Sequence, residues 1–226
     1  MRYQYLLIDN DNTIMDFNAA EAKALVDVLK AYGLPTDEAT IHLYHEINDA
    51  QWKALERGET TQPRLKVERF RLLLAELGRE ELDAIALSDA YANGLGSHAD
   101  LLPGAAEFIR ALHGKIKMAL VSNGVSAIQR GRLSHCPLSP LFDEIIISEE
   151  VGAAKPDPTL LLVAMERLGC TDKSQAVMMG DSLSADIPAA VNAGVDSIFF
   201  SLHGKTSDKA TYTAHNYEDA MSILEG

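Results

Sequence analysis

The stretch LLIDNDNTIMD, residues 6–16, decides the fold. Its apolar residues run directly into Asp9, and Asp11 follows two positions later, before apolar residues resume. A short apolar run that ends in polar residues is typical of a strand buried on both faces of a sheet. Two carboxylates at the end of such a strand repel each other unless a cation compensates them. The stretch therefore predicts a buried strand with a charged site at its end.

Four later segments share this pattern of a short apolar run that ends in small or polar residues. With the first strand at 3–9, the predicted strands are KMALVS (117–122), EIIIS (144–148), AVMMGD (176–181) and DSIFFS (196–201). Three helical patterns lie between them. The first follows Pro103 and Gly104. The second has Asp157 as N-cap and Pro158 at its first position and ends at Gly169, and the third ends at Gly194. Strands and helices that alternate over short links predict an α/β fold, a parallel sheet with helices on both faces.

Residues 15–98 differ from the rest of the chain, because no segment there has a convincing strand pattern. Apolar residues recur at helical spacing in four segments, 20–33, 36–58, 64–78 and 80–95, and Thr36 marks the start of the second. We therefore predict a helical domain at 15–98, inserted after the first strand of a core formed by 1–14 and 99–226.

The overall charge limits the classes of partner. The net charge is −13 and the pI is near 4.9, which argues against nucleic acid or an anionic membrane as a partner. The two cysteines, Cys136 and Cys170, are far apart and predict reduced structural residues. There is no apolar run of transmembrane length, and the acidic start is unlike a signal peptide, so we expect a cytoplasmic protein.

Chemically active side chains collect at the ends of the predicted strands. Because the carboxyl ends of parallel strands share one edge of a sheet, these side chains should converge on one cleft. They are Asp9 and Asp11 after the first strand, Ser122, Asn123 and Gly124 after the second, Lys155 after the third, and Asp181 and Asp186 after the fourth.

These residue types favour phosphoryl transfer. Several carboxylates in one cleft require a hard cation, and Mg²⁺ suits a site that also holds phosphate oxygens. Ser122, Lys155 and the amides of Asn123 and Gly124 are donors for an anion. One carboxylate can attack phosphorus, and a second can donate a proton to the leaving oxygen and then activate water.

The same residues resemble four ordered motifs of the haloacid dehalogenase (HAD) superfamily. DNDNT at 9–13 is similar to its DxDxT motif, Ser122 to its second motif, Lys155 to its third, and GDSLSAD at 180–186 to its GDxxxD motif. The resemblance implies a Rossmann-like core, with 15–98 as the helical cap that this superfamily inserts after the first motif.

The resemblance also implies a role for each residue. Asp9 would be the nucleophile and Asp11 the general acid and base, and this second carboxylate favours a phosphatase or phosphomutase over a dehalogenase. Mg²⁺ would be held by the Asp9 carboxylate, the Asp11 main-chain carbonyl and Asp181. Ser122 and Lys155 would hold the phosphoryl group. Asp186 would lie just outside the metal ligands, and Thr13 would support the loop.

A finer similarity concerns the substrate. VSNGVSAIQRGRL, which contains Gln129, IIISEEVGAAKPDP and VMMGDSLSADIPAAVNAGVDSIFF resemble a branch of bacterial pyrimidine 5′-nucleotidases. This implies a small phosphorylated metabolite as partner, with a nucleoside monophosphate favoured. The alternatives are a sugar-phosphate phosphatase, a phosphomutase and, from another class, a binding module that kept the fold without its activity.

Several cap residues leave open how the cap contributes to the cleft. His42 and His45, three positions apart on a helix, suggest either a metal pair or a solvated helix face. Trp52, Tyr44 and Phe70 suggest cap core, although one of them could face the cleft and stack on a base.

Overall fold

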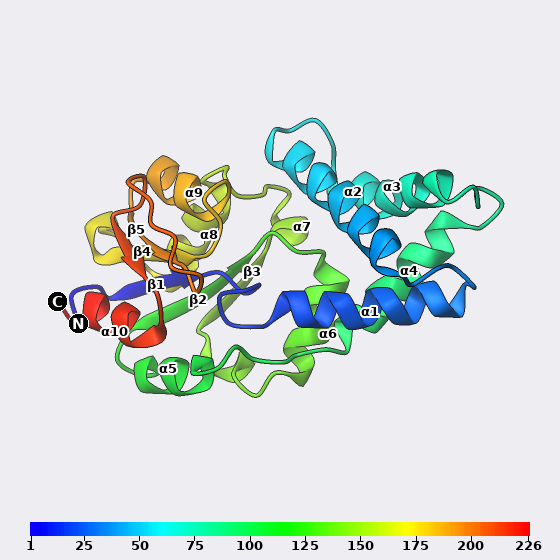
Figure 1. Ribbon diagram of the computed structural model, residues 1–226. Helices are drawn as coiled ribbons and strands as arrows, with labels where there is room; N and C mark the ends of the chain where they lie inside the picture. Colours follow the sequence, from blue (N-terminus) through cyan, green and yellow to red (C-terminus); the bar gives the residue numbers. More distant parts are fainter.

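The computed structural model describes residues 1–226, and its centre is one parallel sheet of six strands in the order β3-β2-β1-β4-β5-β6 (Figure 1). Leu7 at the middle of β1 pairs with Ala119 of β2 on one side and with Met178 of β4 on the other. The strands are β1 Tyr5–Ile8, β2 Lys117–Ser122, β3 Glu144–Ile147, β4 Ala176–Gly180, β5 Asp196–Phe200 and β6 Tyr212–Ala214.

Helices cover both faces of the sheet because every central strand is apolar on both sides. Leu6 and Ile8 belong to one core cluster and Leu7 to the other, as the alternation of side chains along a strand requires. On one face lie α5 (Ala105–Leu112), α10 (Tyr217–Glu225) and the C-terminal part of α6 (Ser126–His135). On the other lie α8 (Thr159–Leu168) and α9 (Asp186–Ala193), above the sheet in Figure 1. The predicted α/β class is confirmed.

Four helices occupy the segment after β1 and pack on one another beside the core (Figure 1). Their bounds are α1 Phe17–Ala31, α2 Glu38–Glu56, α3 Gln62–Glu76 and α4 Ala84–Gly96. Their apolar cluster includes Tyr44, Phe70 and Tyr91, whose rings contact one another, and it also takes in Val125 and Ile128 of the core. The division at 14/15 and 98/99 into a core and a cap remains a prediction.

One close contact joins this helical block to the core. A side chain at Gly131 of α6 would come within 2.8 Å of the carbonyl oxygen of Gly96 at the end of α4. Only a residue without a side chain lets the two helices approach this closely.

The structure differs from the sequence prediction at the ends of some elements. The strand predicted at 3–9 spans only Tyr5–Ile8, and Ser148 opens the short helix α7 (Ser148–Val151) instead of ending β3. Asp37, not Thr36, caps α2 by accepting the Thr40 amide, and Pro158 caps α8, so that helix begins at Thr159. Three further elements had no counterpart in the prediction, α6, β6 and α10. Two short 3₁₀ turns, Ser139–Leu141 and Lys173–Gln175, complete the chain.

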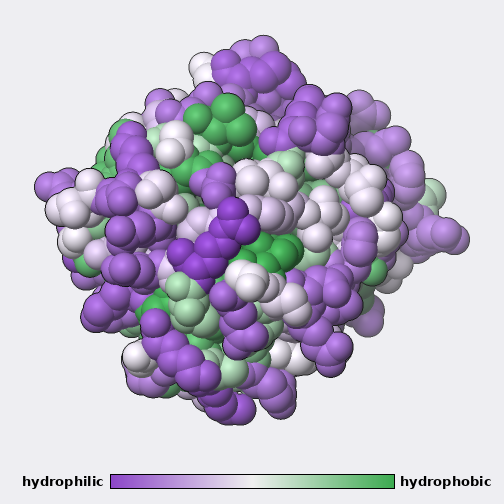
Figure 2. Space-filling model, turned by 90° about the vertical axis from the view of Figure 1, so that its left-hand side faces the viewer, coloured by the Kyte–Doolittle hydropathy of each residue, from purple (hydrophilic) through white to green (hydrophobic).

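The surface agrees with the acidic composition. Figure 2 shows the end of the core that carries both chain termini, where hydrophilic side chains predominate and hydrophobic ones form small separate patches. No helix combines the length and the apolar character needed to cross a bilayer.

Candidate active site

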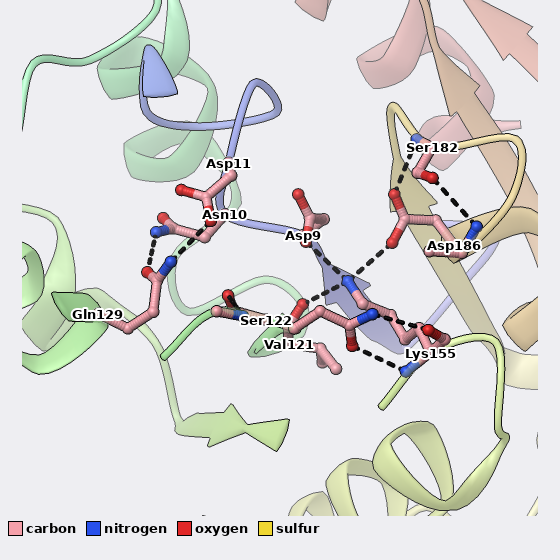
Figure 3. Close-up of polar contacts among 12 residues, drawn as sticks. Asp9, Asn10, Asp11, Val121, Ser122, Gln129, Lys155, Ser182 and Asp186 are labelled. Atoms are coloured by element: carbon pink, nitrogen blue, oxygen red, sulfur yellow. Dashed lines mark hydrogen bonds and ion pairs between the residues drawn. The ribbon is translucent and has the colours of Figure 1, made fainter. Parts of the chain in front are cut away.

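The carboxyl end of β1 places Asp9 beside a buried lysine. The ammonium of Lys155 lies 2.7 Å from Oδ1 of Asp9 and 2.7 Å from Oδ1 of Asp186, and it donates to the Val121 carbonyl at 2.8 Å (Figure 3). Lys155 is only 1% exposed. A buried ammonium is stable only when carboxylates and hydrogen-bond acceptors surround it. The ends of the four strands β1 to β4 therefore converge as the parallel sheet predicts.

Asp181 completes a cluster of three carboxylates. One oxygen each from Asp9, Asp181 and Asp186 lie within 4.8 Å of one another. The donors are all oxygens, and one lysine cannot neutralise three carboxylates, so the cluster suits a hard divalent cation such as Mg²⁺. The Asp11 carboxylate is not part of this cluster, and a ligand role for its main-chain carbonyl remains a prediction.

The pKa shifts of these groups reflect their burial and their mutual charges. Burial, against the opposing effect of Lys155, raises the pKa of Asp9 well above its ordinary value, and Asp186, Asp11 and Asp181 raise it further. Burial and then Asp186 raise the pKa of Asp181 to about 7. Burial alone would lower the pKa of Lys155, but Asp186 and Asp9 outweigh it and the pKa lies above the usual range. A cation at the cluster would favour the ionised carboxylates.

Asp11 points away from Asp9 toward α6 (Figure 3). Its Oδ2 accepts a hydrogen bond of 2.6 Å from Nε2 of Gln129, and its Oδ1 forms an ion pair with the guanidinium of Arg132. Arg132 is fully buried, and its Nε donates to the His98 carbonyl at 2.9 Å. Helix α6 therefore orients the second carboxylate of the motif.

The conformation of the loop between Asp9 and Thr13 is fixed by a turn at Asn12 and by contacts with Gln129 and Tyr217. Asn12 has a φ of 57°, a left-handed conformation that asparagine tolerates better than most residues. The buried side chain of Asn10 donates to Oε1 of Gln129 at 2.6 Å, so Gln129 contacts two residues of this loop. Thr13 is fully buried, and its carbonyl accepts from the Tyr217 hydroxyl at 2.8 Å.

The loop after β2 lies next to Lys155. Asn123 holds the Lys155 backbone from both sides, with Nδ2 donating to its carbonyl at 2.7 Å and Oδ1 accepting its amide at 2.7 Å. Ser122 is fully buried, and its Oγ accepts the Gly124 amide at 3.0 Å. A side chain at Gly124 would collide with Gln129. In this arrangement Asn123, Gly124 and Lys155 reach the cavity, whereas Ser122 shapes the turn beneath them.

A cavity lies between the strand ends and the four helices. Its core side is lined by Asp9, Asp11, Asn12, Asn123, Gly124, Val125, Ile128, Gln129, Lys155, Asp181, Ser182, Ala185 and Asp186, and its other side by Phe17, Asn48, Trp52, Glu56, Arg69 and Leu95. Of the three aromatic candidates, Tyr44 and Phe70 are core and Trp52 faces the cavity. His45 lies 3.5 Å from Glu21 and His42 lies 3.7 Å from Glu46, so neither belongs to the carboxylate cluster.

Sequence reasoning missed several residues around this site, among them Gln62 and Arg132. Gln62, at the start of α3, donates to the Asn123 carbonyl and, at 2.9 Å, to Oγ of Ser148. Arg132 lies on α6 in the run RGRL, where a buried arginine cannot be distinguished by pattern from an exposed one. The one residue of α6 that the sequence did single out is Gln129, which lies in the stretch that resembles the pyrimidine 5′-nucleotidases.

Comparison with known proteins agrees with this geometry. Residues 3–194 match the family model described as haloacid dehalogenase-like hydrolase. The chain is 34% identical to the pyrimidine 5′-nucleotidase PynA of Streptococcus pneumoniae, covering 100% of this chain and 96% of that protein. It is 27% identical to the pyrimidine 5′-nucleotidase YjjG of Escherichia coli, covering 99% of both. The crystal structure of the HAD-hydrolase YfnB from Bacillus subtilis bound to magnesium matches with a TM-score of 0.93 and 34% identity over 100% of both chains.

The chain therefore belongs to the haloacid dehalogenase-like hydrolases, as its motifs predicted. It is a phosphatase of this superfamily, an enzyme that hydrolyses phosphoric monoesters.

Proposed function

We propose that this enzyme is a Mg²⁺-dependent 5′-nucleotidase that prefers pyrimidine nucleoside monophosphates and works through an aspartyl-phosphate on Asp9. The observation that carries the proposal is the Asp9–Lys155–Asp186 constellation at one end of a cavity whose other wall comes from the helices α1–α4. The relatives PynA and YjjG, both pyrimidine 5′-nucleotidases, support the choice of substrate.

In the first step an Asp9 carboxylate oxygen attacks phosphorus, and the bond between phosphorus and the ester oxygen breaks. Lys155, held against Asp9, draws the phosphoryl oxygens toward the nucleophile. A protonated Asp11 gives its proton to the leaving oxygen, so the nucleoside departs as a neutral alcohol. Gln129 and Arg132 hold the ionised Asp11 at the wall of the same cavity, and one Asp11 oxygen must leave its donor before it carries this proton.

In the second step Asp11, now ionised, takes a proton from a water molecule, and that water attacks phosphorus. The bond to Asp9 breaks, which releases inorganic phosphate and restores the Asp9 carboxylate. Asp9, Asp181 and the Asp11 carbonyl would hold Mg²⁺, which neutralises phosphate charge and favours ionised Asp9. Asp186, bound to Lys155 and to the Ser182 amide at 2.9 Å, keeps the lysine in place.

Phosphate release from a panel of nucleoside monophosphates, hexose phosphates and an aryl phosphate tests the proposal. We expect Mg²⁺-dependent release, lost on chelation, with the highest kcat/KM for pyrimidine nucleotides. Preference for a sugar phosphate would replace the nucleotide assignment, and transfer of phosphate back to sugar would identify a mutase. Activity that survives exhaustive chelation would contradict the role of the carboxylate cluster.

A further inference from the structure

The wall of the cavity opposite Asp9 contains a polar and aromatic group for which the proposed reaction has no use. Asn48, Trp52 and Glu56 are spaced four residues apart on α2, so they share one face of that helix, and Arg69 joins them from α3. These side chains line the same cavity as Asp9 and Lys155.

Arg69 is the unusual member of this group, because it is a charged residue only 3% exposed. Its Nη1 donates to Oδ1 of Asn48 at 2.9 Å, and its guanidinium lies over the ring of Tyr91, with 4.7 Å between the guanidinium carbon and the ring centroid. Its Nε donates to the Lys66 carbonyl at 3.4 Å, and the Tyr91 hydroxyl also lies beside the guanidinium. These contacts use at most three of its five N–H groups, and Arg69 lines the cavity, so it keeps donors for a ligand there.

A second buried group holds this arginine in place. Glu21 is 5% exposed, and its Oε1 accepts from Nδ2 of Asn48 at 3.1 Å and from the Tyr91 hydroxyl at 3.3 Å. Asn48 thus stands between the carboxylate and the guanidinium, and Glu21 forms no direct ion pair with Arg69. A charge buried only for packing would be best neutralised by direct pairing. Here the network leaves N–H groups of the guanidinium available to a ligand in the cavity.

We propose that Arg69, positioned by Asn48 and Glu21, donates a hydrogen bond to the C2 carbonyl of a pyrimidine base, while Trp52 covers the face of the ring. The inference rests on the proposed function and names the residues that select its substrate. Uracil, thymine and cytosine all carry a carbonyl at C2, and adenine has none. Arginine is a donor only, so a base without an acceptor at that position leaves a buried charged donor unpaired, which is the situation that rejects a wrong substrate most strongly.

The test compares the wild type with Arg69→Met, a variant that keeps most of the side-chain volume and removes the donors. Both are assayed on the 5′-monophosphates of uridine, cytidine and adenosine, and on ribose 5-phosphate, which has no base. We expect kcat/KM of Arg69→Met to fall by about 10- to 100-fold for the two pyrimidine nucleotides and to stay within about threefold for ribose 5-phosphate. Arg69→Lys should recover part of the loss. Arg71→Met is the matched control, because Arg71 is an exposed arginine of the same helix paired with Glu68.

The outcomes separate this inference from the proposed function. If the wild type hydrolyses pyrimidine nucleotides no better than ribose 5-phosphate, the nucleotide assignment fails and this inference falls with it. If the wild type prefers pyrimidine nucleotides and Arg69→Met keeps that preference, only this inference is overturned. An equal loss on all substrates in a folded Arg69→Met also overturns it, because Arg69 would then act on structure alone.

A substrate probe keeps the test decisive if Arg69→Met does not fold. Sulfur accepts hydrogen bonds more weakly than oxygen, so the wild type should hydrolyse 2-thiouridine 5′-monophosphate about tenfold less efficiently than the uridine nucleotide. Equal efficiency on the two would overturn the inference without any variant.

Discussion

Nε2 of Gln129 lies 2.6 Å from Oδ2 of Asp11, and the same side chain accepts a hydrogen bond from Asn10 at 2.6 Å. Gln129 comes from α6 and the other two from the loop after β1, 119 positions away in the case of Asn10. One amide therefore sets the orientation of the loop that carries the proposed acid and base.

Replacing Gln129 should impair proton transfer selectively. In Gln129→Leu we expect kcat to fall by about tenfold on a nucleotide, a fraction of what general acid catalysis contributes. The loss on an activated aryl phosphate should be much smaller, because an aryloxide leaves without a proton. Asp11→Asn should show the same dependence on the leaving group, with larger losses. Equal losses on both substrates would show that Gln129 supports only the fold.

Removing the proposed nucleophile, Asp9, should abolish turnover. Asp9→Asn keeps the size of the side chain, but a carboxamide cannot form the aspartyl-phosphate, so phosphate release should fall by about three orders of magnitude or more. Asp208→Asn, which changes a carboxylate in the loop between β5 and β6, serves as the matched control and should retain activity. Near-normal turnover in a folded Asp9→Asn protein would refute the assignment.

Lys155 should matter for stability as well as for activity. Lys155→Met leaves Asp9 and Asp186 without their cation, and breaking a buried pair in this way costs about 3–5 kcal/mol of unfolding free energy. Added Mg²⁺ should restore more stability to this variant than to the wild type, because it replaces the missing positive charge. Denaturant unfolding with and without Mg²⁺ measures both effects. Lys117→Met, which breaks an exposed and solvent-screened pair with Asp143, should change the free energy of unfolding far less.

The carboxylate cluster should make stability depend on pH in the absence of metal. The pKa of Asp181 rises from its ordinary value of 3.8 to about 7, through burial and then Asp186, so the folded state binds more protons than the unfolded state between these values. The free energy of unfolding should therefore fall as the pH rises from about 4 to about 7. Thermal melting should show a drop of a few degrees that Asp181→Asn reduces and that Mg²⁺ counteracts. A metal-free melting temperature that is flat over this range would contradict the predicted shift.

Gln62 should couple the helices to the loop that follows β2. Gln62→Ala removes the donor to the Asn123 carbonyl and to Ser148, and leaves these acceptors unpaired at a cost of about 1–3 kcal/mol. Hydrogen exchange of the amides at 123–126 should quicken, and KM should rise several-fold. Gln4→Ala, at an exposed position of the core, should change neither. Unchanged exchange at 123–126 would show that Gln62 does not order the loop.

The sequence alone predicted the parts of this protein that follow from local chemistry. Strands buried on both faces are recognisable because their apolar runs are short and continuous. The C-terminal ends of two helices are recognisable from Gly169 and Gly194, which adopt left-handed backbone with φ of 76° and 75°. The convergence of Asp9, Lys155 and Asp186 follows from a parallel sheet, since all its strands end at the same edge.

Tertiary structure alone decided the rest, because burial of a polar residue depends on neighbours that lie far away in the chain. β6 is three residues long and is a strand only through its pairing with β5. Arg132 and Arg69 resemble surface arginines in sequence, yet Asp11 and the Glu21–Asn48 pair compensate their charges inside the fold. Local pattern thus determined which polar side chains meet at the carboxyl edge of the sheet, whereas the packing of α2, α3 and α6 against that edge determined which side chains line the cavity.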